Sequence, residues 1–460
     1  MKQTTGLTEI ECYLAHHPAP EFVDAFFADL SGVFRGKRYP AEHLPNIMTK
    51  GMALPGSVFL LAVTGESMDP DGYGFSDGDP DELAKVIPGS LQPVPWMETP
   101  TAQVMLSLEN TRGEPYYFEP RNVLRRVLDT FIELDLRPVV AFELEFYLLD
   151  SQRTATGAPQ PPPSPITDRP LHATQVYGMQ ELDDFAAFIS AVTRACAQQG
   201  IATGALTSEY APGQFEINLQ HSDDPLRAAD HAVMFKRAVQ GIARQFGYQA
   251  SFMAKPYQEQ AGSGMHLHLS LIDEQGRNVF DGGGESGTPE CASTLLRYGI
   301  GGLLQIMPDS MALLAPNVNA YRRYQPNIFV PIQRSWGFEN RSTALRIPTG
   351  DGSARRIEHR LAGADANPYL ALASVLAGVH YGITQHCDPG SAFVGNACER
   401  FDPDLPFRLR PALAKLADSE ILKQYFGADY VSAYVDCKRR ELDAFEQHIS
   451  PTEYAWYLGV

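Results

Sequence analysis

The sequence has few cysteines and no long apolar run, and each of these absences excludes a class of protein. Its 6 cysteines among 460 residues are scattered and include no CxxC pair. That pattern fits neither a disulfide framework nor a thiolate zinc site, so we expect reduced thiols and a cytoplasmic location. The first residues lack the apolar core of a signal peptide, and the longest apolar run, residues 58–63, is far shorter than the ~20 residues of a membrane span. We therefore expect no membrane partner.

Positive charge is also scarce. The 37 Lys and Arg residues face 55 Asp and Glu residues, which gives a formal net charge of −18. This balance disfavours nucleic acid and anionic lipid as partners and would attract cations such as metal ions or amines. There is no GxxxxGK[ST] segment, so the chain is not a P-loop enzyme. The apolar content of 44% and the charged content of 20% are still typical of a globular protein.

The order of patterns along the chain predicts two domains. Residues 1–20 read as a short polar leader, and residues 21–114 read as short strands separated by turns. Apolar residues with helical spacing follow at 120–134 and begin with a proline, so we place the second domain at 115–460. We expect further helices at residues 180–199, 225–246, 368–382 and 411–448.

One predicted strand carries two carboxylates on the same face. In the segment VVAFELEFYLL, residues two apart share a face, so Glu143 and Glu145 point away from Phe142, Leu144 and Phe146. Neighbouring carboxylates repel each other unless a cation lies between them, and glutamate is depleted in strands. A solvated strand face is the alternative interpretation of this segment alone.

The same alternation recurs in three later segments. Glu216 opposes two apolar neighbours in QFEINL, and Glu209 precedes it across a turn. His266, His268 and Ser270 share one face of GSGMHLHLSL, while Arg356, Glu358 and Arg360 share one face of RRIEHR. Four such strands predict one sheet with an apolar back and a polar, functional face.

The ligands on this predicted face indicate hard divalent cations. Carboxylates with one imidazole suit Mg²⁺ or Mn²⁺, and five carboxylates exceed what one ion would use, so we expect two or more ions. Such ions with nearby arginines indicate phosphoryl transfer from a nucleotide. The expected ligands are Glu143, Glu145, Glu209, Glu216, His266 and Glu358.

Taken together, these segments resemble the glutamine synthetase family. The resemblance implies an α+β fold, with a small N-terminal β-grasp domain and a large catalytic domain whose antiparallel sheet forms a funnel flanked by helices. It also implies a homo-oligomer of stacked rings, a dodecamer, with sites between subunits. A non-catalytic relative would be expected to lose metal ligands, and this chain keeps all six. The matching segments are FELEFYLL (142–149), SEYAPGQFEINL (208–219), KPYQEQAGSGMHLHLSL (255–271), NAYRRYQP (319–326), ENRSTALRIP (339–348) and ARRIEHRLAGADANPYL (354–370).

The resemblance implies a role for each matching residue. ATP would phosphorylate the γ-carboxylate of L-glutamate, and a nitrogen nucleophile would then displace phosphate to form an amide. One metal position matches Glu145, Glu209 and Glu216, and the other matches Glu143, His266 and Glu358. The nucleotide contacts match His268, Ser270 and Arg356, and the glutamate contacts match Arg323 and Arg360. The groups that stabilise the transferred phosphate match Arg341 and Arg346.

The sequence differs from ammonium-using members at the nucleophile site. Pro55 stands where they carry an aspartate in the small domain, and Phe329 stands where they carry a glutamate on the flap after the Tyr-Arg-Arg segment. Two apolar residues there favour an amine with a carbon chain. The chain also resembles the γ-glutamylpolyamine synthetase branch of the family, and this resemblance implies putrescine or another polyamine as the amine. An ammonium-using glutamine synthetase and a ligase for a monoamine are the alternatives.

A further difficulty concerns the proton on such an amine. An alkylamine has a pKa near that of lysine, about 10.4, so about one molecule in a thousand is unprotonated at pH 7. The usual flap glutamate is absent, so another group must favour deprotonation. Glu339 and Glu66 are the candidates that the sequence offers, although each reads more readily as a surface charge.

Overall fold

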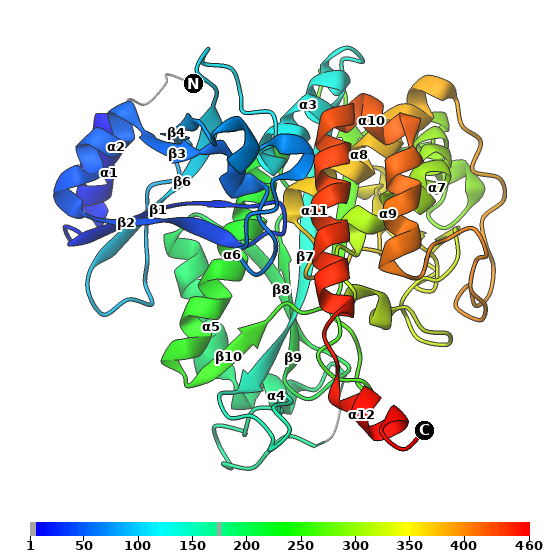
Figure 1. Ribbon diagram of the computed structural model, residues 1–460. Coiled ribbons are helices and arrows are strands. Elements are labelled where there is room, and N and C mark those ends of the chain that lie inside the picture. The colour runs from blue at the N-terminus through cyan, green and yellow to red at the C-terminus, as the bar shows by residue number, and fades with distance from the viewer. Residues whose placement is uncertain (1–5, 173–175) are drawn as a thin grey trace.

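Two β-sheets organise the chain (Figure 1). The structure is a computed structural model that describes residues 6–172 and 176–460. The first sheet has the strand order β2-β1-β6-β4-β3, with β5 paired to β6, and its neighbours are antiparallel except for β1 and β6. Its strands are β1 (Phe22–Ala28), β2 (Phe34–Pro40), β3 (Met52–Pro55), β4 (Asp81–Val86), β5 (Gln92–Pro93) and β6 (Thr101–Glu109).

The first sheet is covered on one side by two short helices. Helix α1 (Gly6–His16) and helix α2 (Leu44–Lys50) contribute Tyr13 and Ile47 to a core that also contains Phe27 of β1. Most of the predicted polar leader is therefore a packed helix, because its buried tyrosine has a partner surface. Alternate residues of β1 face away from this core and belong to the core of the second, larger sheet. Both faces of the strand are therefore buried, which explains why its sequence is almost continuously apolar.

The second sheet is larger and carries the predicted polar face. Its order is β12-β13-β14-β11-β7-β9-β8, with β10 paired to β7, and all neighbours are antiparallel except the edge pair β12–β13. Together with the helices, it confirms the predicted α+β class. Its strands are β7 (Arg137–Asp150), β8 (Thr203–Ser208), β9 (Gln214–Leu219), β10 (Tyr248–Ser251), β11 (Met265–Ile272), β12 (Trp336–Phe338), β13 (Leu345–Ile347) and β14 (Ile357–His359).

Helices pack on the apolar side of this sheet. Phe142, Leu144 and Phe146 of β7 belong to the same buried core as Phe235 and Val239 of α6. In Figure 1, α3, α7, α8, α9, α10 and α11 gather to one side of β7, and α5 and α6 lie to the other. Their bounds are α3 (Pro120–Ile132), α4 (Met179–Asp184), α5 (Ala186–Gln198), α6 (Pro225–Gln245), α7 (Thr294–Leu314), α8 (Pro368–Gln385), α9 (Leu409–Asp418), α10 (Glu420–Phe426), α11 (Ala428–Glu446) and α12 (Pro451–Tyr457).

The helices differ from the predictions in several places, and neither α1, α2 nor α12 was predicted. The predicted helix 180–199 is divided at Phe185, and the predicted helix 411–448 is divided at Ser419 and at Gly427, whose φ is +93°. No helix was predicted over α7, which contains glycines and Pro308, residues that are unfavourable in a helix interior. The glycines have a packing reason: a Cβ at Gly302 would collide with the backbone of α8.

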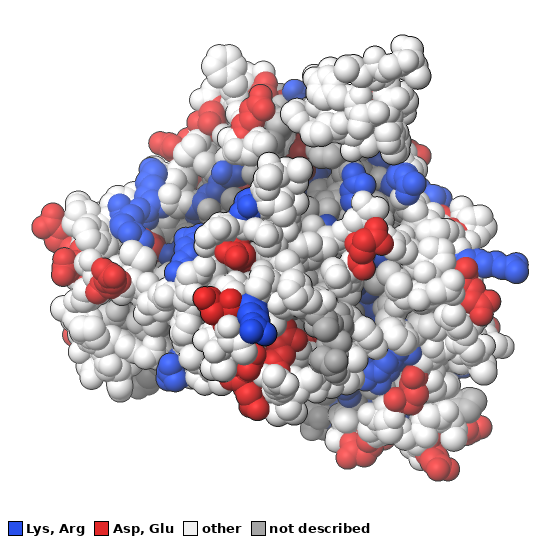
Figure 2. All heavy atoms as spheres, turned by 90° about the horizontal axis from the view of Figure 1, so that it is seen from below, with Lys and Arg blue, Asp and Glu red and all other residues white. Residues whose placement is uncertain are grey.

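The excess of acidic residues does not produce a uniformly acidic surface. On the face shown in Figure 2, basic and acidic side chains are interspersed, and several basic side chains lie in recesses between projecting lobes. Among the residues that the structure describes, we find no helix with the length and hydropathy of a membrane span.

Candidate active site

Strand pairing brings the four predicted polar segments onto adjacent strands. His266 of β11 is opposite Glu143 of β7, and Glu143 is opposite Asn218 of β9. Glu145 is opposite Glu216, and on the other side of β11 His268 is opposite Glu358 of β14. The predicted sheet with one polar face is therefore present.

Glu143 lies at the centre of this face. Its Oε1 is 2.6 Å from Nδ1 of His266, and its Oε2 is 3.2 Å from Nε2 of His268. The side-chain amide of Asn218 donates to Oε2 at 3.0 Å. Burial raises the pKa of Glu143, but the hydrogen bonds and charges of the two histidines outweigh it and hold the pKa well below its usual range.

The remaining carboxylates crowd together without protein cations to neutralise all of them. Burial first, and then the charges of Glu145 and Glu143, raise the pKa of Glu209 to about 8. Burial, Glu143 and Glu145 likewise raise the pKa of Glu216. A divalent cation would relieve this repulsion, and its binding would displace protons from the two acids. The donor set of carboxylates and imidazole therefore fits a hard divalent ion.

The structure groups possible ligand atoms in two sets that share Glu143. One set joins it to Glu216 and His266, and the other joins it to His268 and Glu358, with ligand atoms within 4.8 Å of one another in each. This grouping differs from the predicted division, in which His268 serves the nucleotide. Glu145 lies beside these sets, where its Oε1 is 4.0 Å from Nε2 of His266 and its Oε2 accepts from the Gly264 backbone at 2.9 Å.

Two predicted arginines converge on Glu358. Arg346 donates from Nη1 to Oε2 at 2.7 Å, and Arg360 donates from Nη1 to Oε1. Burial raises the pKa of this carboxyl, but the charges of Arg360, His266 and His268 outweigh it and lower the pKa to about 2. Glu358 therefore stays ionised at this position, 2% exposed.

The other predicted contacts lie around the same face. Buried Arg323 donates to the carbonyl of Leu361 at 2.7 Å, and Nε of Arg356 is 3.2 Å from Nδ1 of His268. Ser270 follows on β11, half-buried and opposite Val139 of β7. Arg341 is exposed, and its charge partly opposes the rise in the pKa of Glu209.

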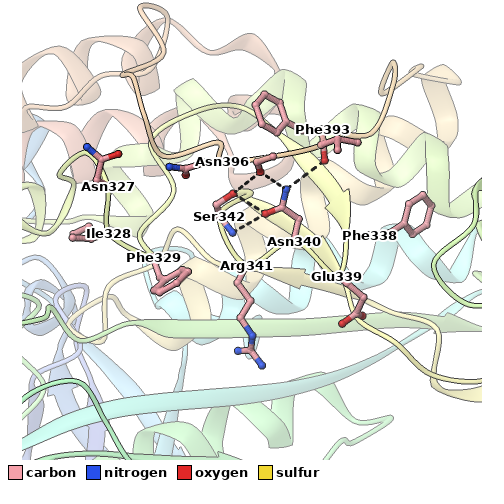
Figure 3. A pocket seen from close by; sticks show the side chains of 12 residues that line it. Asn327, Ile328, Phe329, Phe338, Glu339, Asn340, Arg341, Ser342, Phe393 and Asn396 are labelled. Atoms are coloured by element: carbon pink, nitrogen blue, oxygen red, sulfur yellow. Dashed lines mark hydrogen bonds between the residues drawn. The ribbon is translucent and has the colours of Figure 1, made fainter. Parts of the chain in front are cut away.

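A cavity of about 620 Å³ lies between the loop 393–396 and the flap, the segment around Phe329 (Figure 3). Phe329, Glu339 and Arg341 line it, and in Figure 3 their side chains lie toward the strands of the large sheet. Asn340 fixes the opposite wall, because its Nδ2 donates to the carbonyl of Gly395 at 2.9 Å. The second candidate for the amine site, Pro55, is in β3 of the first sheet and does not line this cavity.

Comparisons with known proteins decide the family. The family model of the glutamine synthetase catalytic domain matches residues 118–457. The chain belongs to this family. It is 42% identical to γ-glutamylputrescine synthetase PuuA of Escherichia coli strain K12, over 98% of this chain and 94% of that protein. It is 33% identical to glutamate–isopropylamine ligase of a Pseudomonas species, over 94% of each chain.

A solved structure of the protein GmaS in complex with ADP has the same fold. Its TM-score to this chain is 0.82 at 27% sequence identity, and the match covers 100% of both chains. The predicted glutamine synthetase fold is thus confirmed along the whole length. The relatives also confirm that the chain is similar to ATP-dependent glutamate–amine ligases.

Three residues at this glutamine synthetase-type site were not predicted. Gln214 and Asn218 donate to Glu145 and Glu143 at 3.3 and 3.0 Å, and both lie two residues from Glu216 on the same face of β9. Period-two spacing was a signal that could have found them. Tyr210 faces Phe329 with ring centroids 6.0 Å apart, a contact across distant segments that spacing does not predict.

Proposed function

We propose that this chain is an ATP-dependent ligase that joins L-glutamate to a small amine and forms a γ-glutamyl amide. The observation that carries the proposal is Phe329, an apolar residue that is 57% exposed in the cavity beside the predicted glutamate-binding arginine. A family member that collects ammonium needs a carboxylate there, whereas an alkylamine gains from apolar contact. The named relatives, a putrescine ligase and an isopropylamine ligase, support an alkylamine.

In this proposal, the residues of the polar face have different roles. Mg²⁺ or Mn²⁺ ions would be held by Glu145, Glu209 and Glu216 and by Glu143, His266 and Glu358. Bound there, such ions supply charge neutralisation for the phosphates of ATP. His268, Ser270 and Arg356 would contact the nucleotide, and Arg323 and Arg360 would bind the glutamate carboxylates. Arg341 and Arg346 would stabilise the phosphoryl group in transfer by charge-assisted hydrogen bonds.

The proposed reaction balances in two steps. The γ-carboxylate of glutamate attacks the terminal phosphorus of ATP, so that ADP leaves and γ-glutamyl phosphate forms. The amine nitrogen then forms a C–N bond to the carbon of the activated γ-carboxyl group, the C–O bond from that carbon to phosphate breaks, and the nitrogen loses a proton. Sequestering the acyl phosphate from water would keep it from hydrolysis, a role that fits the flap around Phe329.

We also propose how the protein assembles and where in the cell it acts. We expect a homo-oligomer of stacked rings, a dodecamer, in which a neighbour's small domain brings Pro55 to the cavity, since the chain's own Pro55 lies elsewhere. Analytical ultracentrifugation measures this mass directly. We also expect the enzyme to act in the cytoplasm, where ATP and glutamate are supplied.

Isotope transfer tests the proposed chemistry. Glutamate labelled with ¹⁸O in its γ-carboxylate should transfer one ¹⁸O atom to inorganic phosphate for each γ-glutamyl amide formed with putrescine. Mass spectrometry of the phosphate and of the amide measures both products. Amide formation without ¹⁸O in the phosphate would exclude the acyl phosphate, and ADP release without any amide would contradict the ligase assignment.

A further inference from the structure

The cavity beside the flap combines an apolar wall with one carboxylate. Asparagine and serine side chains line part of it, and Glu339 is the one carboxylate among the described residues of the lining. Arg341 supplies the one positive side chain, and its charge acts on Glu209. A cavity that combines apolar side chains with a single acid is suited to an alkyl chain that ends in an ammonium group. The apolar lining residues are Ile328, Phe329, Phe338, Phe393 and Val394.

Glu339 is held in place by its backbone. It follows β12 directly, its N–H donates to the carbonyl of Ile347 at 3.0 Å, and its φ of +54° lies in the left-handed region. A residue other than glycine in this conformation costs free energy, which the surrounding turn must offset. The conformation therefore fixes where the side chain of Glu339 leaves the chain at the edge of the cavity.

The carboxylate of Glu339 keeps capacity for a second cation. Its Oε2 accepts from Nη2 of Arg346 at 3.3 Å, whereas Nη1 of the same arginine binds Glu358 at the shorter distance of 2.7 Å. The side chain of Glu339 is 42% exposed, against 2% for Glu358. Glu358 is thus the main partner of Arg346, and Glu339 faces the cavity with part of its carboxylate open.

Resting on the ligase function proposed above, we propose that Glu339 binds the non-reacting ammonium group of a diamine. The reacting nitrogen would lie near Phe329, whose backbone oxygen accepts from Arg360 at 3.4 Å, beside the predicted glutamate site. The second nitrogen would reach Glu339 across the same cavity, with the methylene chain against the aromatic residues. With a pKa near 10.4, that nitrogen is charged at neutral pH and needs an anionic partner.

This assignment makes the nucleophile a diamine such as putrescine in preference to a monoamine. It also differs from a role for Glu339 as the base for the reacting nitrogen. A base would act equally on diamines and monoamines, whereas a partner for the second ammonium group acts on diamines alone. 1,4-Diaminobutane and butylamine differ by one terminal amino group. The ratio of kcat/KM for 1,4-diaminobutane to that for butylamine therefore tests whether Glu339 binds that group.

The test compares this ratio in the wild-type enzyme and in variants at Glu339. Wild type should prefer the diamine, and Glu339→Gln should lower the ratio about 10- to 100-fold, the range for a lost charged hydrogen bond. Glu339→Asp keeps the charge but is one methylene shorter, so it should favour 1,5-diaminopentane over 1,4-diaminobutane relative to wild type. The matched control is Glu399→Gln, an exposed glutamate outside the cavity lining, which should keep the wild-type ratio.

The outcomes separate this inference from the proposed function. An unchanged ratio in Glu339→Gln, or a ratio in Glu339→Asp as low as in Glu339→Gln, would overturn the role of Glu339 while the amine ligase stands. If kcat/KM falls to the same extent for both amines, Glu339 acts by holding Arg346 or by transferring a proton. That result would also overturn the role of Glu339 as the partner of the second ammonium group. Ammonium as the best substrate of the wild type would instead remove the ligase function on which the inference rests.

Discussion

The backbone oxygen of Phe329 accepts a hydrogen bond from Nη2 of Arg360 at 3.4 Å. The other terminal nitrogen of Arg360, Nη1, binds Glu358, a predicted metal ligand. The flap residue that we predict to distinguish this chain from ammonium-using relatives is thus one hydrogen bond away from the predicted glutamate site. The side chain at position 329 should therefore influence which nucleophile reaches the activated carboxyl group.

A carboxylate at position 329 should move the preference toward ammonium. Phe329→Glu introduces a negative charge at the position that we predict to match the flap glutamate of ammonium-using family members, and it removes apolar contact with an alkylamine. We expect the ratio of kcat/KM for ammonium to that for putrescine to rise at least about 10-fold, the lower range for a charged hydrogen bond. Rates of ADP release with each nucleophile measure the ratio.

Phe401→Glu is the matched control for that substitution. Phe401 is also an exposed aromatic residue, 45% against 57% for Phe329, but it lines a different cavity. Its variant should keep the wild-type ratio. If both variants change the ratio equally, a general charge effect and not the flap position determines the nucleophile.

Loss of the Glu145 carboxylate should disable the proposed metal site. Glu145→Gln keeps the shape of the side chain but removes one ligand charge, so Mn²⁺ affinity should fall at least about 10-fold, as it does when a ligand's supporting partner is lost. Turnover should be abolished, since the charge acts where phosphate moves. Calorimetric titration with Mn²⁺ and ADP release measure the two effects.

The control for Glu145 lies on the turn beyond the far end of β11. Glu274→Gln removes an exposed carboxylate there and should leave Mn²⁺ affinity and turnover at wild-type values. Near-normal turnover in Glu145→Gln would contradict the assignment of the whole polar face.

A buried acid between the two sheets should make stability depend on pH. Glu119 accepts hydrogen bonds at Oε2 from the Leu108 backbone at 2.7 Å and from Asn122 at 2.9 Å, and burial raises its pKa from 4.5 to about 7. Below pH 4.5 the group is protonated in both the folded and the unfolded chain. As pH rises to about 7, the group ionises in the unfolded chain but stays protonated in the folded chain. The free energy of unfolding therefore falls by about 3 kcal/mol over this range.

Glu119→Gln should remove that dependence. The amide oxygen can accept the same hydrogen bonds, so relative to wild type the variant should gain stability between pH 5 and pH 8. Urea unfolding at both pH values measures the gain. Glu133→Gln, at an exposed position at the other end of α3, is the control. Its free energy of unfolding should vary with pH as that of wild type does. A variant whose stability changes with pH as wild type does would show that Glu119 is not protonated in the fold.

The sequence predicted the polar face of the large sheet better than it predicted the helices. Alternation in β7, β9, β11 and β14 is a local signal, and it identified the strands whose pairing forms the polar face. Helix α7 was missed because its glycines serve contact with α8, and that contact is not visible in local propensity. The breaks at Phe185, Ser419 and Gly427 depend on turns that helical periodicity does not reveal.

The division of ligands and the position of Glu339 could not be predicted for a similar reason. Which carboxylates meet depends on strand register, and register brings Glu143 against both histidines. Glu339 read more readily as a surface charge, since only the folded chain places it in the same cavity as Phe329. Glu66, the other candidate, is exposed in the segment between β3 and β4 and does not line that cavity.

The central claim is that the nucleophile is an alkylamine and not ammonium. The most direct measurement is kcat/KM for the wild-type enzyme with glutamate and ATP, for ammonium, putrescine, spermidine, ethanolamine and isopropylamine in turn. The account predicts that an alkylamine, with putrescine first, exceeds ammonium. Ammonium as the best nucleophile in this panel would contradict it.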